Sequence, residues 1–494
     1  MKSKYIKVIG MEKKTATANK VMSAVGLFVL VVAVGVFVVY NPAFERHNIF
    51  VVLTFFINIV LFVTQLLAST NNHSFGFKVI FWTFNLFFFG LAPFYQYVSN
   101  SYIWGYRASD REYVINNVYI LFWSIVYIIG TKIKFGKRKQ AKTKYKKLIE
   151  NVEYDYVIRR NCLNVMLILS VLVVAYYMIF VGYENMFFRN TSVNKALKEI
   201  KPLLLLEDHI FKNITLFTFV LHIVRAKQQK ILSIQLLISA ISFLITNFPT
   251  GITRFAMAAI YAGLIIIVID NTRKGRWFIT VFILALVVVF PAIDIFRSEN
   301  LFESVTDFGA TIKQQIEGVY TTGDYDSYSM FINVRRYIKF FDFSYGRQLL
   351  GAALFFVPRA IWSSKPSGTG STVFLALHPE FTNVSAPLIA EGYVDFGIIG
   401  VVVYALINGV VNAWADRKYW TSENPLSKER IVYPFLIIQF FFLLRGDLMS
   451  GGAYFVGRMV MGLAIYYFVV KKVPINKKEA EPIKPRLSKY IKQK

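Results

Sequence analysis

The sequence predicts an all-α protein that crosses a membrane about twelve times and has one large extracytoplasmic loop. The first observation is composition, because 55% hydrophobic and 17% aromatic residues over 494 positions are more than one soluble core can bury. The second is a mean hydropathy of +0.47, and the third is a series of apolar runs that can each span a bilayer. These observations exclude an ordinary soluble globular protein.

Candidate membrane spans are apolar runs of roughly 17 to 25 residues, the length that a helix needs to cross the hydrocarbon core. They lie near 21–40, 49–69, 77–98, 113–131, 161–182, 210–224, 231–249, 252–270, 277–296, 386–412, 431–445 and 453–470. The chain is thereby divided into a first membrane part, 1–296, a large loop, 297–385, a second membrane part, 386–470, and a basic tail, 471–494.

The basic residues indicate how these spans are oriented. The formal net charge is +27, and most of the Lys and Arg residues fall in the termini and in alternate connections, above all in 132–160. Cytoplasmic connections of membrane proteins carry this excess, so we expect both termini in the cytoplasm and the large loop outside. Because the segment 132–160 adjoins two spans, we expect it to contact anionic lipid, and no nucleic-acid partner is predicted.

The large loop contains an apolar element of its own. The run from Leu349 to Val357 has about nine residues and is too short to span a bilayer. Between Gly346 and Pro358 we expect a re-entrant or interfacial helix, because aromatic side chains such as Trp362 favour the headgroup level. The alternative is the core of a small extramembrane domain.

Charged residues near the predicted outer surface form the candidate binding site. Ionisable side chains at membrane depth are costly and therefore indicate function. The planar guanidinium group of arginine donates two parallel hydrogen bonds to a phosphate. We expect a diphosphate or sugar site that is built from Arg254, Arg335, Arg336, Arg359, Lys365, Arg445 and Asp447. The structural alternative for each arginine is an anchor that reaches the membrane surface.

Two carboxylates are the candidate catalytic groups. Glu391 and Asp395 are four residues apart at the start of the tenth span, which puts both on one face of a helix. A carboxylate beside a diphosphate site can take a proton from an attacking sugar hydroxyl while arginines stabilise the leaving diphosphate. Glu391 is the first candidate for this base and Asp395 the second. An interhelical ion pair with Arg254 or Arg445 is the alternative for either.

The His, Asp and Glu residues show no spacing that is typical of a metal site. Neither a metal ion nor another cofactor is therefore expected.

Three segments carry a resemblance to a known family: 358–370 (PRAIWSSKPSGTG), 387–400 (PLIAEGYVDFGIIG) and 445–447 (RGD). Together with the span number and the late large loop, they resemble the Wzy-type O-antigen and capsular polysaccharide polymerases. The resemblance implies a metal-independent glycosyltransferase of the GT-C type in the bacterial cytoplasmic membrane. Such an enzyme moves a growing glycan from undecaprenyl diphosphate to the non-reducing end of an incoming lipid-linked repeat unit.

The expected partners follow from this resemblance. They are an undecaprenyl-diphosphate-linked oligosaccharide, membrane lipids, a chain-length regulator protein and a flippase. Two other functions stay open: an O-antigen ligase would use the same donor, and a flippase or other transporter of lipid-linked oligosaccharides would place charges around a cavity near the bilayer midplane. The charges here gather near the outer surface instead, so the active site is expected on that side.

Overall fold

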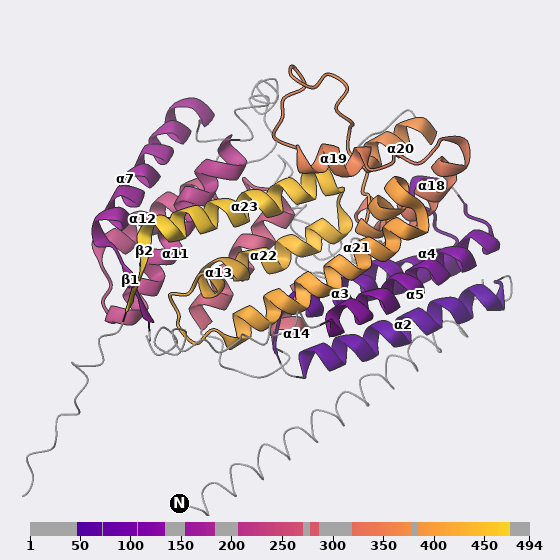
Figure 1. Ribbon diagram of the computed structural model, residues 1–494, viewed down its shortest axis with the longest axis horizontal. Helices are drawn as coiled ribbons and strands as arrows, with labels where there is room; N and C mark the ends of the chain where they lie inside the picture. The colour runs from indigo at the N-terminus through magenta and orange to yellow at the C-terminus, as the bar shows by residue number, and fades with distance from the viewer. Residues whose placement is uncertain are drawn as a thin grey trace, which may run out of the picture.

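The computed structural model of the protein describes residues 47–71, 73–105, 107–133, 154–182, 206–269, 277–285, 319–377 and 384–474. Helices make up most of these residues, and one small sheet accompanies them (Figure 1). The predicted span at 21–40, residues 297–318 of the large loop and residues 475–494 of the basic tail lie outside the described residues. The helix content agrees with the predicted all-α class.

Six helical segments of the described chain are long and apolar enough to cross a membrane. They are α2 (Ile49–Thr70), the continuous run of α3 (Phe77–Phe84), η2 (Asn85–Leu91) and α4 (Ala92–Val98), α5 (Asp110–Lys132), α7 (Arg160–Tyr176) with η4 (Tyr177–Val181), α21 (Leu388–Thr421) and α23 (Leu448–Val469). Each overlaps one of the predicted spans. They indicate a membrane protein, whereas the full number of twelve spans stays a prediction.

Shorter or more polar helices overlap the other predicted spans within the described residues. They are η5 (Glu207–Phe211) with α11 (Lys212–Gln229), α12 (Ile234–Thr246), α13 (Arg254–Ile269), α14 (Trp277–Leu284) and α22 (Lys428–Arg445). α13 packs against α22, and α22 packs against α23. α7, α11 and α12 form a second group of neighbours at the left of Figure 1.

Helices α21 and α5 make a close contact through small residues. A Cβ atom at Gly409 of α21 would lie 2.4 Å from the carbonyl oxygen of Tyr127, and one at Gly130 of α5 would lie 2.7 Å from that of Leu406. Neither position has room for a side chain. Small residues let membrane helices approach until their backbones touch, and this contact fixes α21 against the N-terminal part of the bundle.

α21 bends once and binds the start of another helix. The bend lies at Gly397, whose φ of +59° is a value that favours glycine. Beyond the bend, the buried Asp416 accepts hydrogen bonds from the backbone N–H groups of Phe77, at 2.8 Å, and Lys78, at 3.2 Å. These are the first residues of α3. A carboxylate satisfies N–H groups that a helix leaves unpaired at its start, so α21 stabilises the position of α3.

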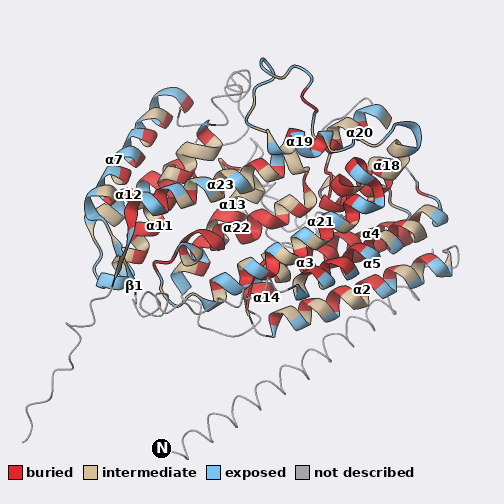
Figure 2. Cartoon of the chain, viewed as in Figure 1, coloured by how far each residue is buried: buried red, intermediate tan, exposed pale blue. Residues whose placement is uncertain are grey.

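Apolar side chains cover outward faces of the bundle. On α7, Ile168 is 60% and Leu172 is 58% exposed, and on α12 Leu237 is 56% exposed. Figure 2 shows exposed residues along α7 and α2, whereas the middle of the bundle around α22 is largely buried. Large apolar surfaces of this kind are typical of helices that face lipid.

Short helices of the large loop lie at one end of the bundle (Figure 1). They are η7 (Val319–Thr321), η8 (Gly323–Tyr325), α18 (Ser327–Phe340), α19 (Arg347–Ala353) and α20 (Thr369–Leu377), and η3 (Ile103–Gly105) contacts η8. α19 covers the first part of the predicted apolar run and packs against α21 and α23. Leu349 and Leu350 are exposed, whereas Gln348 and Gly351 are buried. The run therefore lies on the surface of the bundle, and it is not the core of a separate domain.

The small sheet lies at the other end of the bundle. β1 (Tyr154–Ile158) pairs with β2 (Val470–Pro474) in antiparallel register, with Tyr156 opposite Lys472. β1 directly precedes α7, and β2 directly follows α23. Since α23 begins beside α19 and ends in β2, the sheet and the large loop lie at opposite ends of this helix. We refer to the two ends below as the loop end and the sheet end.

Candidate functional site

A cavity lies at the loop end, where several helices begin or end. Its volume is about 460 Å³, and its walls come from the start of α13, from η8, from the end of α22 and from the start of α23. Three residues of the predicted binding set line it: Arg254, Arg445 and Asp447. Segments that are far apart in the sequence therefore meet in one concave site, which is the usual form of a ligand site.

Two arginines from different helices converge on one carboxylate in this cavity. Arg254 begins α13 and Arg445 ends α22. Nη2 of Arg254 lies 3.1 Å from Oδ2 of Asp324, and Nη2 of Arg445 lies 3.7 Å from Oδ1 of the same residue. All three side chains stay partly exposed. The two guanidinium groups can therefore share a single anionic group at the cavity wall.

Backbone carbonyls of η8 fix Arg445 in place. Its Nε donates to the carbonyl oxygen of Asp324 at 2.7 Å, and its Nη2 donates to that of Gly323 at 2.9 Å. Nη2 also lies 3.6 Å from Oδ1 of the buried Asp326. Burial raises the pKa of the Asp326 carboxyl, and the charge of Arg445 opposes this rise. The positive charge of Arg445 is thus held in position by the loop itself.

Asp447 lines the cavity from the start of α23. Its Oδ1 accepts hydrogen bonds from the backbone N–H of Ser450, at 2.7 Å, and from the hydroxyl of Ser450, at 2.9 Å, which makes Asp447 the N-cap of α23. An N-cap is fixed by the helix that it starts. The carboxylate of Asp447 therefore has a defined position in the wall of the cavity that the two arginines also line.

Glu391, the first predicted catalytic residue, lies next to the cavity but is not among the residues that line it. Its Oε1 accepts a hydrogen bond from the backbone N–H of Leu448 at 2.7 Å, and its Oε2 accepts one from the hydroxyl of Thr369 at 2.6 Å. The residue is only 2% exposed. Leu448 begins α23 and Thr369 begins α20, so Glu391 joins the starts of these two helices.

Asp395, the second predicted catalytic residue, is bound to a third helix start. It is 0% exposed, and it accepts hydrogen bonds from the hydroxyl of Ser344 and from the backbone N–H groups of Gln348, at 3.2 Å, and Leu349, at 3.1 Å. Gln348 and Leu349 lie in the first turn of α19. Asp395 thus satisfies N–H groups that α19 cannot pair internally, and it does not line the cavity.

Arg335 and Arg336 lie outside the cavity and join α18 to α5. Arg336 makes a bidentate ion pair with Glu112, with both N–O distances at 2.7 Å. Arg335 donates to the carbonyl oxygen of Glu112 and to Oδ1 of Asn116, each at 3.4 Å, and lies 5.4 Å from the ring centroid of Tyr119. These partners account for both guanidinium groups within the helix contact.

Arg359 and Lys365 lie in the connection between α19 and α20. Arg359 donates to the carbonyl oxygens of Lys365, at 2.6 Å, and Pro366, at 3.1 Å. Nζ of Lys365 donates to those of Phe355, at 2.6 Å, and Val357, at 3.0 Å. Burial lowers the pKa of Lys365, and the charge of Arg359 lowers it further. Both cations hold their own connection together, and neither lines the cavity.

Several polar residues of the cavity are absent from the predicted set, among them Asp324 and Gln439. Asp324 lies in the segment 321–328 (TTGDYDSY), where two acidic residues stand in the large loop. The two acidic residues were a usable signal, because acidic side chains in this loop can form ion pairs with arginines at the ends of the apolar spans. Asp324 is 70 residues from Arg254 and 121 from Arg445, so only the fold brings them together.

Comparison with family models, with curated proteins and with solved structures finds no match for this chain. Within the described residues, no group of three or more His, Cys, Asp or Glu side chains is arranged to hold a metal ion. The cavity combines two positioned guanidinium groups with the carboxylates of Asp324 and Asp447. This arrangement can bind an anionic group beside a carboxylate that can accept a proton.

Proposed function

We propose that this protein polymerises lipid-linked oligosaccharide repeat units at the outer face of a bacterial cytoplasmic membrane, for O-antigen or capsule biosynthesis. The growing glycan would move from undecaprenyl diphosphate to the non-reducing end of an incoming undecaprenyl-diphosphate repeat unit. The observation that supports this proposal is the convergence of Arg254 and Arg445 in a cavity at one end of a bundle of apolar helices. A lipid diphosphate carries its charge at the membrane surface, where such a site could bind it.

Binding of the diphosphate would involve an exchange of anions. Asp324 now accepts contacts from both Arg254 and Arg445. A diphosphate carries more charge than one carboxylate and offers more acceptor oxygens to the two planar guanidinium groups. It would therefore replace Asp324 at one or both arginines. Since Asp324 belongs to η8, substrate binding would be coupled to the position of the large loop.

The transfer itself needs a base and a stabilised leaving group. A bond forms between the acceptor hydroxyl oxygen and the anomeric carbon of the donor sugar, and the bond from that carbon to the diphosphate oxygen breaks. The two arginines stabilise the charge that develops on the diphosphate, and a carboxylate takes the hydroxyl proton. We assign this base to Asp447, because it lines the same cavity as the arginines. Glu391 and Asp395 act as positioning residues, since their oxygens bind the starts of neighbouring helices.

The proposal includes neither a metal ion nor another cofactor. The resemblance to metal-independent polymerases suggests this, and the two guanidinium groups can supply the positive charge that the leaving diphosphate requires. The proposed partners are membrane lipids, a flippase that delivers repeat units and a chain-length regulator protein. Addition of a chelator is accordingly expected to leave the rate unchanged.

The direct test is polymerisation by the purified full-length protein in detergent. Synthetic undecaprenyl-diphosphate repeat units are incubated with the protein, and the products are separated by size on a polysaccharide gel. A ladder of products that grows by one repeat unit per step is expected. Transport has no meaning in detergent, so the absence of any longer product would favour a flippase or transporter over a polymerase.

A deletion in cells separates the polymerase from an O-antigen ligase. Loss of a polymerase leaves single repeat units attached to the lipid A core, whereas loss of a ligase leaves none. Complete loss of attached repeat units, together with transfer to a lipid A core in vitro, would contradict the proposed polymerase.

A further inference from the structure

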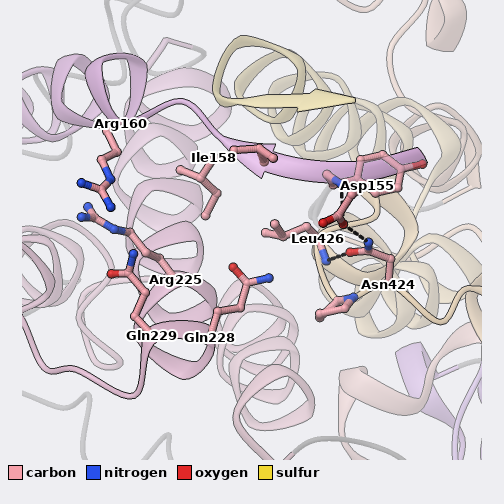
Figure 3. A pocket seen from close by; sticks show the side chains of 11 residues that line it. Asp155, Ile158, Arg160, Arg225, Gln228, Gln229, Asn424 and Leu426 are labelled. Atoms are coloured by element: carbon pink, nitrogen blue, oxygen red, sulfur yellow. Dashed lines mark hydrogen bonds between the residues drawn. The ribbon is translucent and has the colours of Figure 1, made fainter. Parts of the chain in front are cut away.

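A second pocket lies at the sheet end of the bundle (Figure 3). Its volume is about 360 Å³, and its walls come from β1, from the start of α7, from the end of α11 and from the connection between α21 and α22. In the predicted orientation this end faces the cytoplasm. The proposed polymerase makes no use of this pocket, so an inference about it stands independently.

Two guanidinium groups point toward one another at one end of this pocket, as Figure 3 shows for Arg160 and Arg225. Arg160 begins α7, and Arg225 lies near the end of α11. Nη1 of Arg225 donates to Oε1 of Gln235 at 3.0 Å, and Nε2 of Gln235 donates to Asn164 at 3.2 Å. Neutral side chains therefore hold Arg225 beside a like charge. Like charges repel, and an anion between them would replace this repulsion by two attractions.

No carboxylate in the described part of the chain forms an ion pair with either arginine. Asp155 is the acidic residue that lines the pocket, and it lies at the opposite end in Figure 3. Its Oδ1 accepts hydrogen bonds from the backbone N–H of Tyr156, at 2.7 Å, and from Nδ2 of Asn424, at 3.0 Å. The pocket thus has a positive end that the described residues leave uncompensated.

Two glutamines complete the polar lining near the arginines. Gln228 and Gln229 end α11 and line the pocket together with Arg225. Their side-chain amides are neutral and can donate two hydrogen bonds each. Guanidinium forks with neighbouring amide donors suit the several acceptor oxygens of a phosphate group, and they add no opposing charge.

The surroundings of the pocket favour a phosphate on a lipid over a free one. After Arg160 on α7, Val165 is 44% and Ile168 is 60% exposed. Ile234, in the first turn of α12, is 70% exposed. Val165 and Ile168 follow Arg160 by about one to two helical turns on α7, and Ile234 adjoins Gln235, the hydrogen-bond partner of Arg225. Acyl chains could lie along these apolar side chains while the headgroup reaches the pocket, and a soluble phosphate would gain none of this apolar contact.

We propose that the pocket between Arg160 and Arg225 binds the phosphate group of an anionic phospholipid in the cytoplasmic leaflet. Each guanidinium group donates to phosphate oxygens, and the amides of Gln228 and Gln229 donate from the side. The exposed faces of α7 and α12 contact the acyl chains. Such a lipid would fix the mutual position of α7 and α11, whose ends carry the two arginines.

The test is lipid binding by the full-length protein in mixed detergent micelles. A fluorescent phosphatidylglycerol probe is titrated, and phosphatidylcholine with the same label serves as the neutral probe. Arg160→Gln and Arg225→Gln are each expected to lower the affinity for phosphatidylglycerol about tenfold, the effect of losing one charge-assisted hydrogen bond. Arg417→Gln is the matched control, because Arg417 is exposed on the last turns of α21 and does not line the pocket. It is expected to change the affinity less than about twofold.

Three results of the titrations with the natural protein and the arginine variants would overturn the proposal. They are equal affinity for the two probes, equal affinity for phosphatidylglycerol in all variants, and displacement of the lipid probe by inorganic phosphate at equal concentration, which would indicate a soluble ligand. Gln228→Glu guards against variants that fail to fold, because Gln228 is exposed and the change adds a carboxylate at the pocket. Unchanged affinity in folded Gln228→Glu protein would also contradict the proposal.

Discussion

The two ends of the bundle surround paired arginines with different partners. At the loop end, Arg254 and Arg445 contact the carboxylate of Asp324. At the sheet end, Arg160 and Arg225 have neighbouring amides and no ion pair with a carboxylate of the described chain. A diphosphate at the loop end would displace an internal carboxylate, whereas an anion at the sheet end would displace no carboxylate of the described residues. The first arrangement suits a ligand that comes and goes with each turnover, and the second suits one that stays.

This comparison separates the effects that changes at each end should have. Changes to the residues that line the loop-end cavity are expected to act on catalysis, and changes to the residues that line the sheet-end pocket are expected to act on lipid binding and stability. The following variants test that separation.

Removal of the proposed base should have the largest effect. Asp447→Asn is expected to lower the rate of polymerisation about 10²- to 10⁴-fold, because a neutral amide cannot accept the hydroxyl proton. Asparagine is as good an N-cap as aspartate, so the start of α23 should be preserved. The rate is measured in a single turnover with lipid-linked repeat units. Arg417→Gln at the sheet end is the control, and a rate near that of the control would assign the base elsewhere, with Glu391→Gln as the next variant.

The second-largest effect is expected for the paired arginines of the loop end. Arg445→Ala is expected to lower kcat/KM about 10- to 100-fold, and Arg445→Lys less, because a lysine keeps a point charge but loses the planar fork. Equal losses in the two variants would argue against a bidentate contact with diphosphate. Arg336→Ala is the matched control, since it breaks the ion pair with Glu112 away from the cavity. It should lower thermal stability while kcat/KM of the folded protein changes little.

Replacing the carboxylates of α21 that bind helix starts should lower stability at both ends of the bundle alike. Asp395→Asn is expected to lower the free energy of unfolding by about 1–3 kcal/mol, because an amide nitrogen cannot accept hydrogen bonds from the N–H groups of α19. Asp416→Asn should have a similar effect at α3. Thermal unfolding in detergent measures both. A variant that loses activity at full stability would instead give Asp395 a direct catalytic role.

The smallest effect concerns pH at the sheet end. His73 stacks on Trp420 with ring centroids 4.5 Å apart, and burial, together with the charge of Lys78, lowers its pKa from 6.5 to about 4. The unfolded chain thus takes up a proton at higher pH than the folded one. The stability that His73 contributes is present above pH 6.5 and is lost as the pH falls from 6.5 to about 4.

The variant His73→Gln should therefore lose less stability on acidification than the natural protein. We expect the drop in Tm between neutral pH and pH 5 to be smaller by about 2–4 °C, as measured by thermal unfolding in detergent. The same pH dependence in both proteins would show that other groups dominate.

The sequence analysis grouped Arg254, Arg445 and Asp447, and the structure brings these three residues together in one cavity. Each is a charged residue at the boundary of an apolar run, where the cost of burial makes a charge informative. Arg336 was harder to interpret, because its partner Glu112 is 224 residues away and a loop charge can pair with many acids. The pattern of apolar runs likewise predicted helices. Whether a given helix such as α22 crosses the membrane also depends on the helices that pack against it, and the pattern alone does not identify these.

The hydrogen-bond partners of Glu391 and Asp395 could not be predicted for another reason. Their spacing correctly indicated a helix, but their partners are backbone N–H groups and hydroxyls at the starts of α19, α20 and α23. Every residue except proline carries a backbone N–H, so a carboxylate that binds one leaves no mark in the partner sequence. Buried carboxylates near a membrane surface therefore suggest catalysis and helix capping equally until the fold is known.

The carboxylates of α21 also impose an order on biogenesis. Asp416 is synthesised 339 residues after Phe77, whose N–H donates to it, so the first amides of α3 leave the ribosome without the carboxylate that binds them in the folded protein. They stay so until most of the chain has been translated and α21 has inserted. Arg445 and Asp447 follow almost at once. A nascent chain that stops before α21 therefore has neither a finished bundle nor the second half of the anion site, and translation completes both within the same short interval.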